Sequence, residues 1–223
     1  MDTRLLQFSF REWEKMFGIN FTPEERNTVG EFPWSEEILR ESYPWVVGRR
    51  IEKRTVAETH LAFVGRHRVK AGPLTMMRLY KMFPPNPKFP GLDVPSFQMW
   101  PIEDHLKTNR FSAIQVPKLR WYLMPIQVSP CTLRKNYENG KATFSENYEV
   151  PYAIEEILKN FLLWHVVPDK AYHNRRALCR DLVSGGDRAA VGPFTDDGLW
   201  VGGIWDNPPR HDTGIAASRI LGR

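Results

Sequence analysis

Apolar residues recur at helical spacing in three segments of the chain, and they predict helices over residues 9–17, 73–83 and about 151–167. The first of these begins with Ser9 and Glu12, which have the spacing of a capping box. A further short helix is expected after Ser35, because serine is a favoured N-cap residue.

The helix predicted over residues 151–167 has the most pronounced two-sided pattern. Pro151 suits its first turn, and Pro168 ends it. Its apolar face contains Ile154, Ile157, Leu158, Phe161 and Leu162, while the polar residues Glu155, Glu156, Lys159 and Asn160 lie away from most of that face.

The other apolar runs are short and predict strands. Residues 60–64 form one strand, and the aromatic-rich residues 119–128 give the strongest strand pattern in the chain. Three more strands are expected near the C-terminus, over residues 188–194, 199–201 and 215–220. In the second of these, Trp200 is expected to face opposite to its neighbours. Turn residues occur at Asn139–Gly140, 184–187 and 197–198. A loop is expected over residues 205–213. Residues 171–181 fit no single pattern.

Prolines recur every few residues between Pro84 and Pro101. Their spacing excludes a helix or a central strand, because proline lacks the backbone donor that both require. We expect an irregular surface segment there, packed by Phe89, Phe97 and Trp100.

These elements predict a single α+β domain over residues 1–223, with short, mostly antiparallel strands, a few helices and many loops. The 42% of hydrophobic residues is enough for a sizeable core. The 18 prolines and 15 glycines predict many irregular connections.

Charge adds little to this picture, because the net charge is only +5. Proteins that bind nucleic acid usually carry a basic stripe, whereas the Arg and Lys residues of this chain are spread along it. The densest run, Arg49–Arg54, contains a glutamate, and a solvated strand face is the favoured interpretation. Contact of this run with nucleic acid or another polyanion is the alternative.

The sequence contains no phosphate-binding, dinucleotide-binding or zinc-protease motif. Its six histidines show no tight ligand spacing, so we expect no metal site and no cofactor. Cys131 and Cys179 predict two reduced thiols, with one disulfide as the alternative.

The N-terminus lacks the apolar core of a secretory signal. No stretch approaches the roughly 18 apolar residues that a membrane helix needs. We therefore expect a protein without an export signal or membrane span of its own, located in the cytoplasm or on a virion.

Residues 171–223 differ in composition from the rest of the chain, and we refer to them as the tail. The tail contains no Lys, Glu, Gln or Met, whereas the first 170 residues contain 38 residues of these four types. At that frequency about a dozen would be expected in a segment of this length. The tail is nevertheless rich in Arg, Asp and Gly and contains two tryptophans, so it is not a low-complexity linker.

The residue types that are missing from the tail share a property in the genetic code. Lys, Glu, Gln, Met and Trp are the amino acids that no codon ending in C or T encodes, and of these five the tail keeps only Trp200 and Trp205. Asn codons whose adenines are randomised yield Tyr, Asp, His, Ser, Gly, Arg, Ala, Leu and Pro, but never those five. The composition of the tail therefore indicates how its coding sequence was made.

Three runs in the tail resemble the variable region of diversity-generating retroelement target proteins: Val191–Phe194, Gly198–Val201 and Gly214–Arg219. In that family an error-prone reverse transcriptase rewrites the C-terminal segment at adenines. Tyr148–Glu156 is similar to a helix start in the formylglycine-generating-enzyme type of C-type lectin fold, which many of these proteins use. The resemblance implies a C-type lectin-like fold with residues 171–220 as its hypervariable region. No oxidase chemistry is implied, because the chain lacks a matching pair of active-site cysteines.

Alternation and turn positions divide the tail into a buried frame and a displayed set of side chains. The frame is predicted to contain Asp181, Arg188, Val191, Phe194, Leu199, Val201, Trp205, Ile215 and Arg219. The displayed, ligand-binding set is predicted to contain Ala177, Leu178, Arg180, Ala190, Pro193, Thr195, Asp197, Trp200, Gly202, Asp206, Arg210, His211 and Asp212. This mixture of aromatic, charged and small residues is typical of adaptable binding surfaces.

We therefore expect a non-enzymatic ligand-binding protein that presents a hypervariable surface to a macromolecular partner, and we expect that partner to be a protein. One alternative is an enzyme on the same fold, with a pocket near Cys131, Cys179 or the histidines. The other is a basic module that associates with nucleic acid through Arg49–Arg54.

Overall fold

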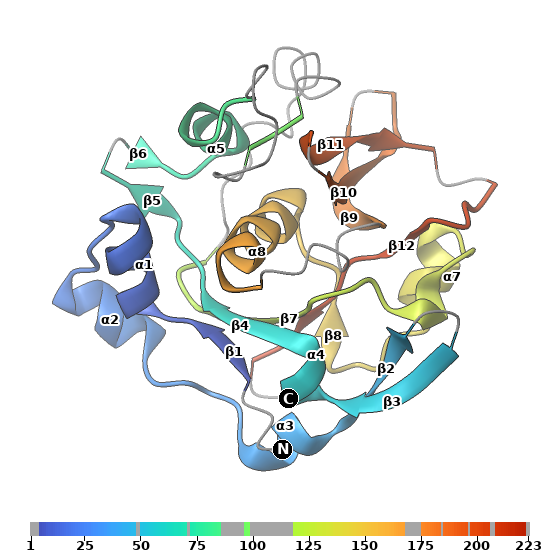
Figure 1. The fold of residues 1–223 in the computed structure, drawn as a ribbon, viewed down its shortest axis with the longest axis horizontal. Coiled ribbons are helices and arrows are strands. Elements are labelled where there is room, and N and C mark those ends of the chain that lie inside the picture. The colour runs from blue at the N-terminus through green and yellow to red at the C-terminus, as the bar shows by residue number, and fades with distance from the viewer. Residues whose placement is uncertain are drawn as a thin grey trace.

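Helix α8 (Ala153–Val166) lies between two sheets at the centre of the molecule (Figure 1). One is a three-stranded sheet of order β1-β4-β7, and the other is a four-stranded sheet of order β11-β10-β9-β12, which we call the tail sheet. The computed structural model describes residues 5–47, 50–70, 72–85, 96–98, 118–167, 175–183, 185–195, 197–205 and 208–221. Short strands in small sheets and several helices make this a mixed α+β fold, as the sequence predicts.

The other helices are shorter than α8: α1 (Phe10–Phe17), α2 (Pro23–Val29), α3 (Glu36–Arg40), α4 (Val56–Thr59), α5 (Met76–Met82), the 3-10 helix η2 (Pro130–Thr132) and α7 (Tyr137–Lys141). The strands are β1 (Leu6–Phe8), β2 (Ser42–Val47), β3 (Arg50–Thr55), β4 (His60–Val64), β5 (Arg68–Val69), β6 (Gly72–Pro73), β7 (Trp121–Pro125), β8 (Tyr148–Glu149), β9 (Arg176–Leu182), β10 (Arg188–Thr195), β11 (Gly198–Ile204), β12 (Thr213–Ile215) and β13 (Ser218–Arg219). Pairing is antiparallel except for β1 with β4 and β12 with β9.

One hydrophobic core cluster includes residues from Leu5 to Ala216. Phe161 of α8 lies near its middle, with its ring centroid 4.9 Å from that of Phe97 and 5.9 Å from that of Phe194. Phe97 is fully buried, which confirms its predicted packing role. Phe89 and Trp100, which were expected to act with it, lie outside the described residues, as does Pro168.

The polar residues of α8 are also buried, because the helix is covered on both sides: Glu155, Glu156, Lys159 and Asn160. Lys159 forms an ion pair with Glu156 and donates a hydrogen bond of 3.0 Å to the carbonyl oxygen of Pro125. Glu155 accepts hydrogen bonds of 2.8 Å from the Tyr122 hydroxyl and from the backbone N–H of Tyr152. These internal partners reduce the cost of burying charged and polar groups.

Helix starts were predicted well where a local cap decides them. The backbone N–H of Ser9 donates a 2.8 Å hydrogen bond to Glu12, so α1 begins with the expected capping box. Ser35 is the N-cap of α3. Helix α5 and strands β4 and β7 lie within their predicted ranges.

Two local predictions are wrong. Asn139–Gly140 lies inside α7 and not in a turn, because the Asn136 side chain accepts a 2.9 Å hydrogen bond from the backbone N–H of Asn139 and caps that helix. A glycine suits position 140 because a Cβ there would lie 2.5 Å from the Ile215 side chain. The strand expected over residues 215–220 is divided into β12 and β13.

The basic run predicted as a solvated strand face forms β3, whose residues Arg50–Lys53 are exposed. Arg49 lies outside the described residues. Strand β3 pairs with β2 as a separate hairpin, which the sequence pattern did not predict. Helix α2 was also missed, although Thr22 and Glu25 form a capping box at its start.

The end of the tail is attached to the N-terminal part of the chain by a buried arginine. Strand β13 pairs with β8 and carries Arg219, whose side chain is only 1% exposed. Its Nη1 and Nη2 atoms donate hydrogen bonds of 2.6 and 2.8 Å to the carboxylate of Glu41, which is 45% exposed. Such a bidentate pair fixes both distance and orientation.

We expect Glu41→Ala to lower the free energy of unfolding by about 3 kcal/mol, because it leaves the buried guanidinium of Arg219 without its carboxylate. The matched control is Glu36→Ala, which removes an exposed ion pair with Arg40 and should cost less than about 0.5 kcal/mol. Urea unfolding of both variants measures the difference. Equal costs would show that the Arg219 pair does not stabilise the fold.

His60 is a second buried titratable group. Its Nε2 atom lies 3.0 Å from the Tyr148 hydroxyl, and its Nδ1 atom lies 2.9 Å from the Thr59 hydroxyl. Burial, followed by repulsion from the charge of Arg219, lowers the pKa of His60 from 6.5 to about 3. As the pH falls, the unfolded chain therefore binds this proton before the folded chain does.

The contribution of His60 to stability should be complete above about pH 6.5 and should be lost as the pH falls toward about 3. We expect the free energy of unfolding, taken relative to that of a His60→Gln variant, to fall by about 1.4 kcal/mol per pH unit within this window. Urea unfolding at a series of pH values tests this. A constant difference between wild type and variant would contradict a buried neutral imidazole.

Candidate functional site

One face of the tail sheet packs into the core that surrounds α8. Its buried residues include Ala177, Cys179, Ala189, Val191, Phe194, Leu199 and Val201. The Phe194 ring stacks on Trp164 of α8, with the ring centroids 4.6 Å apart. The predicted frame residues are confirmed as buried at Asp181, Val191, Phe194, Leu199, Val201, Ile215 and Arg219, and Arg188 is half-buried.

The opposite face of the tail sheet packs against α7, which contacts the edge strand β12. A second hydrophobic cluster joins Tyr137 of α7 and Val150 to the sheet residues Leu178, Ala190, Ile204 and Ile215. Trp200 packs against this second cluster, whereas its neighbours Leu199 and Val201 belong to the main core. The predicted opposite facing of Trp200 is therefore confirmed.

Four residues of the predicted displayed set are buried, and the expectation that they project into solvent is wrong: Ala177, Leu178, Ala190 and Gly202. Ala177 belongs to the core face of the sheet. Leu178 and Ala190 lie on the other face, beneath α7, and Gly202 is the pairing partner of Ala190 in β11. Alternation separates the two faces of a strand, but it does not reveal that a distant helix covers one of them.

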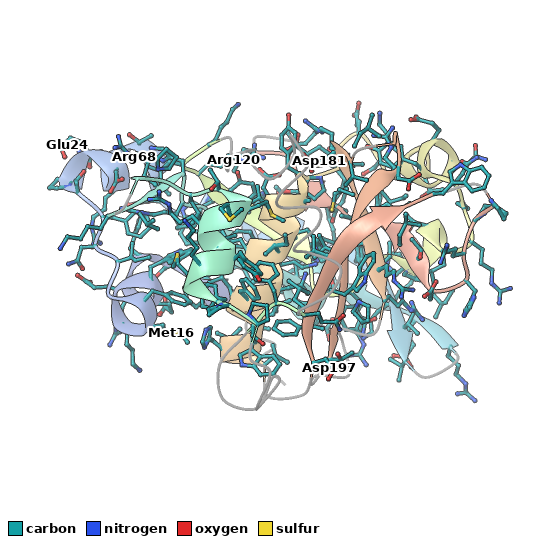
Figure 2. All side chains as sticks on the ribbon, turned by 90° about the horizontal axis from the view of Figure 1, so that it is seen from above. Met16, Glu24, Arg68, Arg120, Asp181 and Asp197 are labelled. Carbon is teal, nitrogen blue, oxygen red and sulfur yellow. The ribbon has the colours of Figure 1, made fainter. Side chains whose placement is uncertain are left out.

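Five of the remaining predicted residues are exposed: Arg180, Thr195, Asp197, Arg210 and His211. Three are half-buried: Pro193, Trp200 and Asp212. Asp206 lies outside the described residues. Thr195 and Asp197 lie at the turn between β10 and β11, and Figure 2 shows Asp197 at the opposite end of the tail sheet from Asp181. The residues 210–212 instead belong to the connection between β11 and β12, the two edge strands of the sheet. The predicted set is therefore distributed over separate regions.

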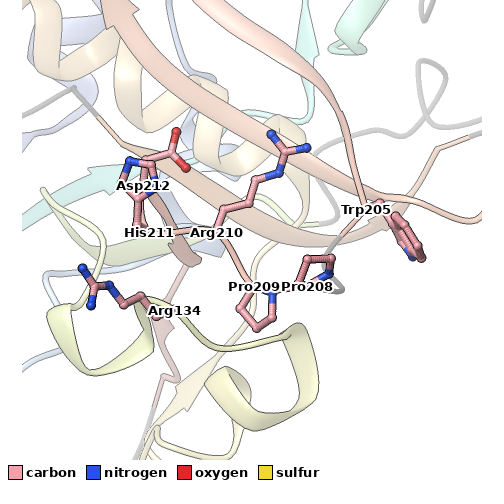
Figure 3. Close-up of a pocket in the computed structure, with 7 residues that line it drawn as sticks. All are labelled: Arg134, Trp205, Pro208, Pro209, Arg210, His211 and Asp212. Carbon is pink, nitrogen blue, oxygen red and sulfur yellow. The ribbon is translucent and has the colours of Figure 1, made fainter.

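A groove of about 570 Å³ lies beside the connection between β11 and β12 (Figure 3). Its lining residues define what we call the tail groove: Arg134, Trp205, Pro208, Pro209, Arg210, His211 and Asp212. Arg134 comes from the loop between η2 and α7, so the groove combines tail residues with one residue from outside the tail. Pro208 and Pro209 lie between Arg134 and Trp205 in Figure 3.

Trp205 was predicted as a buried frame residue, and this is wrong, because its side chain is 66% exposed. The preceding residue, Ile204, is the last residue of β11 and is buried. The chain leaves the sheet at this point, so strand alternation no longer determines which way Trp205 points.

Asp212 is held by a residue that the sequence interpretation missed. Its carboxylate forms an ion pair with Arg176, and the Arg176 backbone N–H donates a 3.0 Å hydrogen bond to the Asp212 carbonyl oxygen. The Arg176 guanidinium also lies 5.1 Å from the centroid of the Trp200 ring. No sequence pattern marks Arg176, because residues 171–181 fit no single element.

A second, smaller pocket of about 210 Å³ bears on the enzyme alternative. It is lined by Lys118, Arg120, Tyr122, Glu149, Tyr152, Glu155 and Arg180. Burial raises the pKa of Glu155, but its carboxylate already accepts two hydrogen bonds. Glu149 bridges Arg120 and Arg180, with contacts of 2.6 and 3.3 Å. The hydrogen bonds of Glu155 and the ion pairs of Glu149 stabilise the fold around the pocket. They leave neither carboxylate free to act as a base.

The cysteines add no nucleophile to this pocket. Both are free thiols, and neither lines it. Cys179 is buried, and burial raises the pKa of its thiol well above the usual value, which disfavours the reactive thiolate. Cys131 is exposed.

No protein-family model, curated protein or solved structure matches the chain. Within the described ranges, no group of three or more His, Cys, Asp or Glu side chains is arranged to hold a metal ion. In the same ranges, every helix is too short or too polar to cross a membrane.

The division between buried and exposed tail positions predicts unequal tolerance to substitution. Ala190→Tyr should lower the free energy of unfolding by about 2 kcal/mol or more, because the ring must enter the packed space beneath α7. His211→Tyr introduces the same side chain at an exposed position and should change it by less than about 0.5 kcal/mol. Urea unfolding measures both values. Equal tolerance at the two positions would contradict the assignment of Ala190 to a covered face.

Proposed function

We propose that this chain is a ligand-binding protein whose tail surface is diversified by a retroelement, on a C-type lectin-like fold. The observation that carries the proposal is the complete absence of Lys, Glu, Gln and Met from the tail. The mixed α+β architecture with short, mostly antiparallel strands is compatible with such a fold.

A diversified surface requires a frame that remains folded while exposed side chains change. In the tail this frame consists of buried residues on both faces of the tail sheet, including Val191, Leu199 and Ile215. Arg219 adds the ion pair with Glu41 at the end of the chain. Substitutions outside these anchors cost little stability, so many surfaces are compatible with one fold.

Side-chain exposure is the criterion for the contact residues that we propose. We assign ligand contact to the exposed and half-buried positions of the predicted set, and no longer to Ala177, Leu178, Ala190 and Gly202. Trp205 joins the set because it is exposed and lines the tail groove. Tryptophan cannot arise from an Asn codon by adenine changes alone, so Trp205 is best explained as a constant aromatic contact beside varied neighbours.

The proposed ligand is a protein. An exposed tryptophan with arginine nearby matches the residue types that are enriched at the energetic centres of protein interfaces. Affinity would arise from a few desolvated aromatic and arginine contacts, and neither a metal nor a cofactor is needed for such binding.

Randomising Thr195, Asp197, Arg210 and His211 in a displayed library tests this function. We expect most members to remain resistant to protease, because these side chains are exposed. Selection of the folded members against a panel of unrelated proteins should give specific binders.

The matched control library randomises Leu178, Ala190, Val191 and Leu199, which are buried. Most of its members should be digested. Two outcomes would contradict the proposal: equal digestion of the two libraries, or a folded surface library that gives no binder to any protein in the panel.

A further inference from the structure

The described residues that line the tail groove carry more positive than negative charge. Arg134 and Arg210 are exposed, and neither forms an ion pair with another described residue. Asp212 is the acidic member of the lining set, and its carboxylate is already paired with Arg176. Two guanidinium groups are therefore available to an incoming anion, and His211 adds a third group that can donate hydrogen bonds.

The same groove has an exposed apolar surface. Trp205 is two-thirds exposed, and Pro208 and Pro209 are exposed beside it. Proline fixes its own backbone torsion, so this part of the groove loses little conformational entropy when a ligand binds. An exposed tryptophan next to arginine is also a frequent combination in the centre of protein interfaces.

The backbone of Arg134 is unusual. Its φ angle is +59°, and among the described residues it is the one non-glycine residue with a positive φ. A residue held in this region costs free energy, and such residues are concentrated at binding and active sites. The backbone angle of Arg134 is a second feature of the groove that points to function. It is independent of the first, because it concerns the backbone and not charge.

We propose that the tail groove binds an acidic, extended segment of a protein partner, with one carboxylate held by Arg134, another held by Arg210, and an apolar side chain seated against Trp205. This inference rests on the proposed function and specifies its partner. The groove volume of about 570 Å³ fits a few side chains of such a segment.

A nucleic acid fits the groove less well than an acidic protein segment. Recognition of a phosphate backbone needs a row of cations that follows the strand. Here two arginines flank an apolar surface, and the Arg176–Asp212 pair adds no net charge beside it. The combination of separated positive charge with tryptophan and proline matches carboxylates alternating with apolar side chains.

The test uses a short fluorescent peptide of alternating Glu and Leu residues as the probe, with the full chain in solution. We expect it to bind, and to bind more weakly as salt is added. The Arg134→Glu/Arg210→Glu double variant should lose about tenfold or more in affinity, because both charges are reversed. Trp205→Ala should reduce binding of the same peptide by a similar factor.

Arg40→Glu is the matched control. Arg40 is exposed and lies on α3, outside the groove, so its reversal changes the net charge without touching the site. It should leave peptide affinity within about twofold of wild type, because the exposed charge is distant and screened. Circular dichroism and thermal unfolding of all variants establish that they are folded.

Comparison peptides decide the chemistry of the partner. A peptide with Lys in place of Glu should not bind, and poly-glutamate or duplex DNA should compete only weakly. Three results would overturn the inference: binding of the Lys peptide as tight as that of the Glu peptide, competition by poly-glutamate or DNA as strong as that by the unlabelled Glu peptide, or a loss of affinity in Arg40→Glu as large as in the double variant. Absence of acidic-peptide binding would also overturn it, and binders from the surface library would then show that the proposed function stands without it.

Discussion

The position of the tail depends on the N-terminus of α8. Asp181 of β9 accepts a hydrogen bond from the backbone N–H of Ala153, the first residue of that helix. A carboxylate at this place satisfies an otherwise unpaired donor and interacts favourably with the helix dipole. Because α8 is buried between the two sheets, this contact joins the tail sheet to the least exposed helix of the described structure. The pairing of β13 with β8 and the ion pair of Arg219 with Glu41 then secure the other end of the tail.

Local sequence patterns predicted the elements whose determinants are close together in the chain. The Ser9–Glu12 cap and the N-cap Ser35 each act within one turn of helix, and the structure has them as expected. Alternation likewise identified Val191, Leu199 and Val201 as buried positions of strands. The C-type lectin-like topology stays a prediction that rests on a resemblance, and the retroelement origin stays a prediction that rests on the composition of the tail.

The errors arose where a contact depends on residues far apart in sequence. Leu178 and Ala190 are buried because α7, from another part of the chain, covers them. The same packing explains Gly140, which permits close approach of Ile215 and does not mark a turn. Arg134 and Arg176 were missed as site residues, because neither carries a motif and both acquire their role through contacts made in the folded chain. Trp205 was predicted in the frame, but it follows the last residue of β11, where no strand partner determines which way its side chain points.

The proposed variation of the tail requires that different positions serve folding and recognition. Buried apolar and paired residues occupy the strands, while Arg210 and His211 lie on the exposed connection between the two edge strands. The missing residue types are informative because a fold of this kind gives no physical reason to exclude Lys or Glu from exposed positions. Sequencing the DNA on either side of the gene tests the origin of the tail most directly. Retroelement diversification predicts a neighbouring reverse-transcriptase gene and a near-copy of the tail's coding sequence that differs only at adenines. The absence of both, together with Lys and Glu codons in the tails of close relatives, would contradict it.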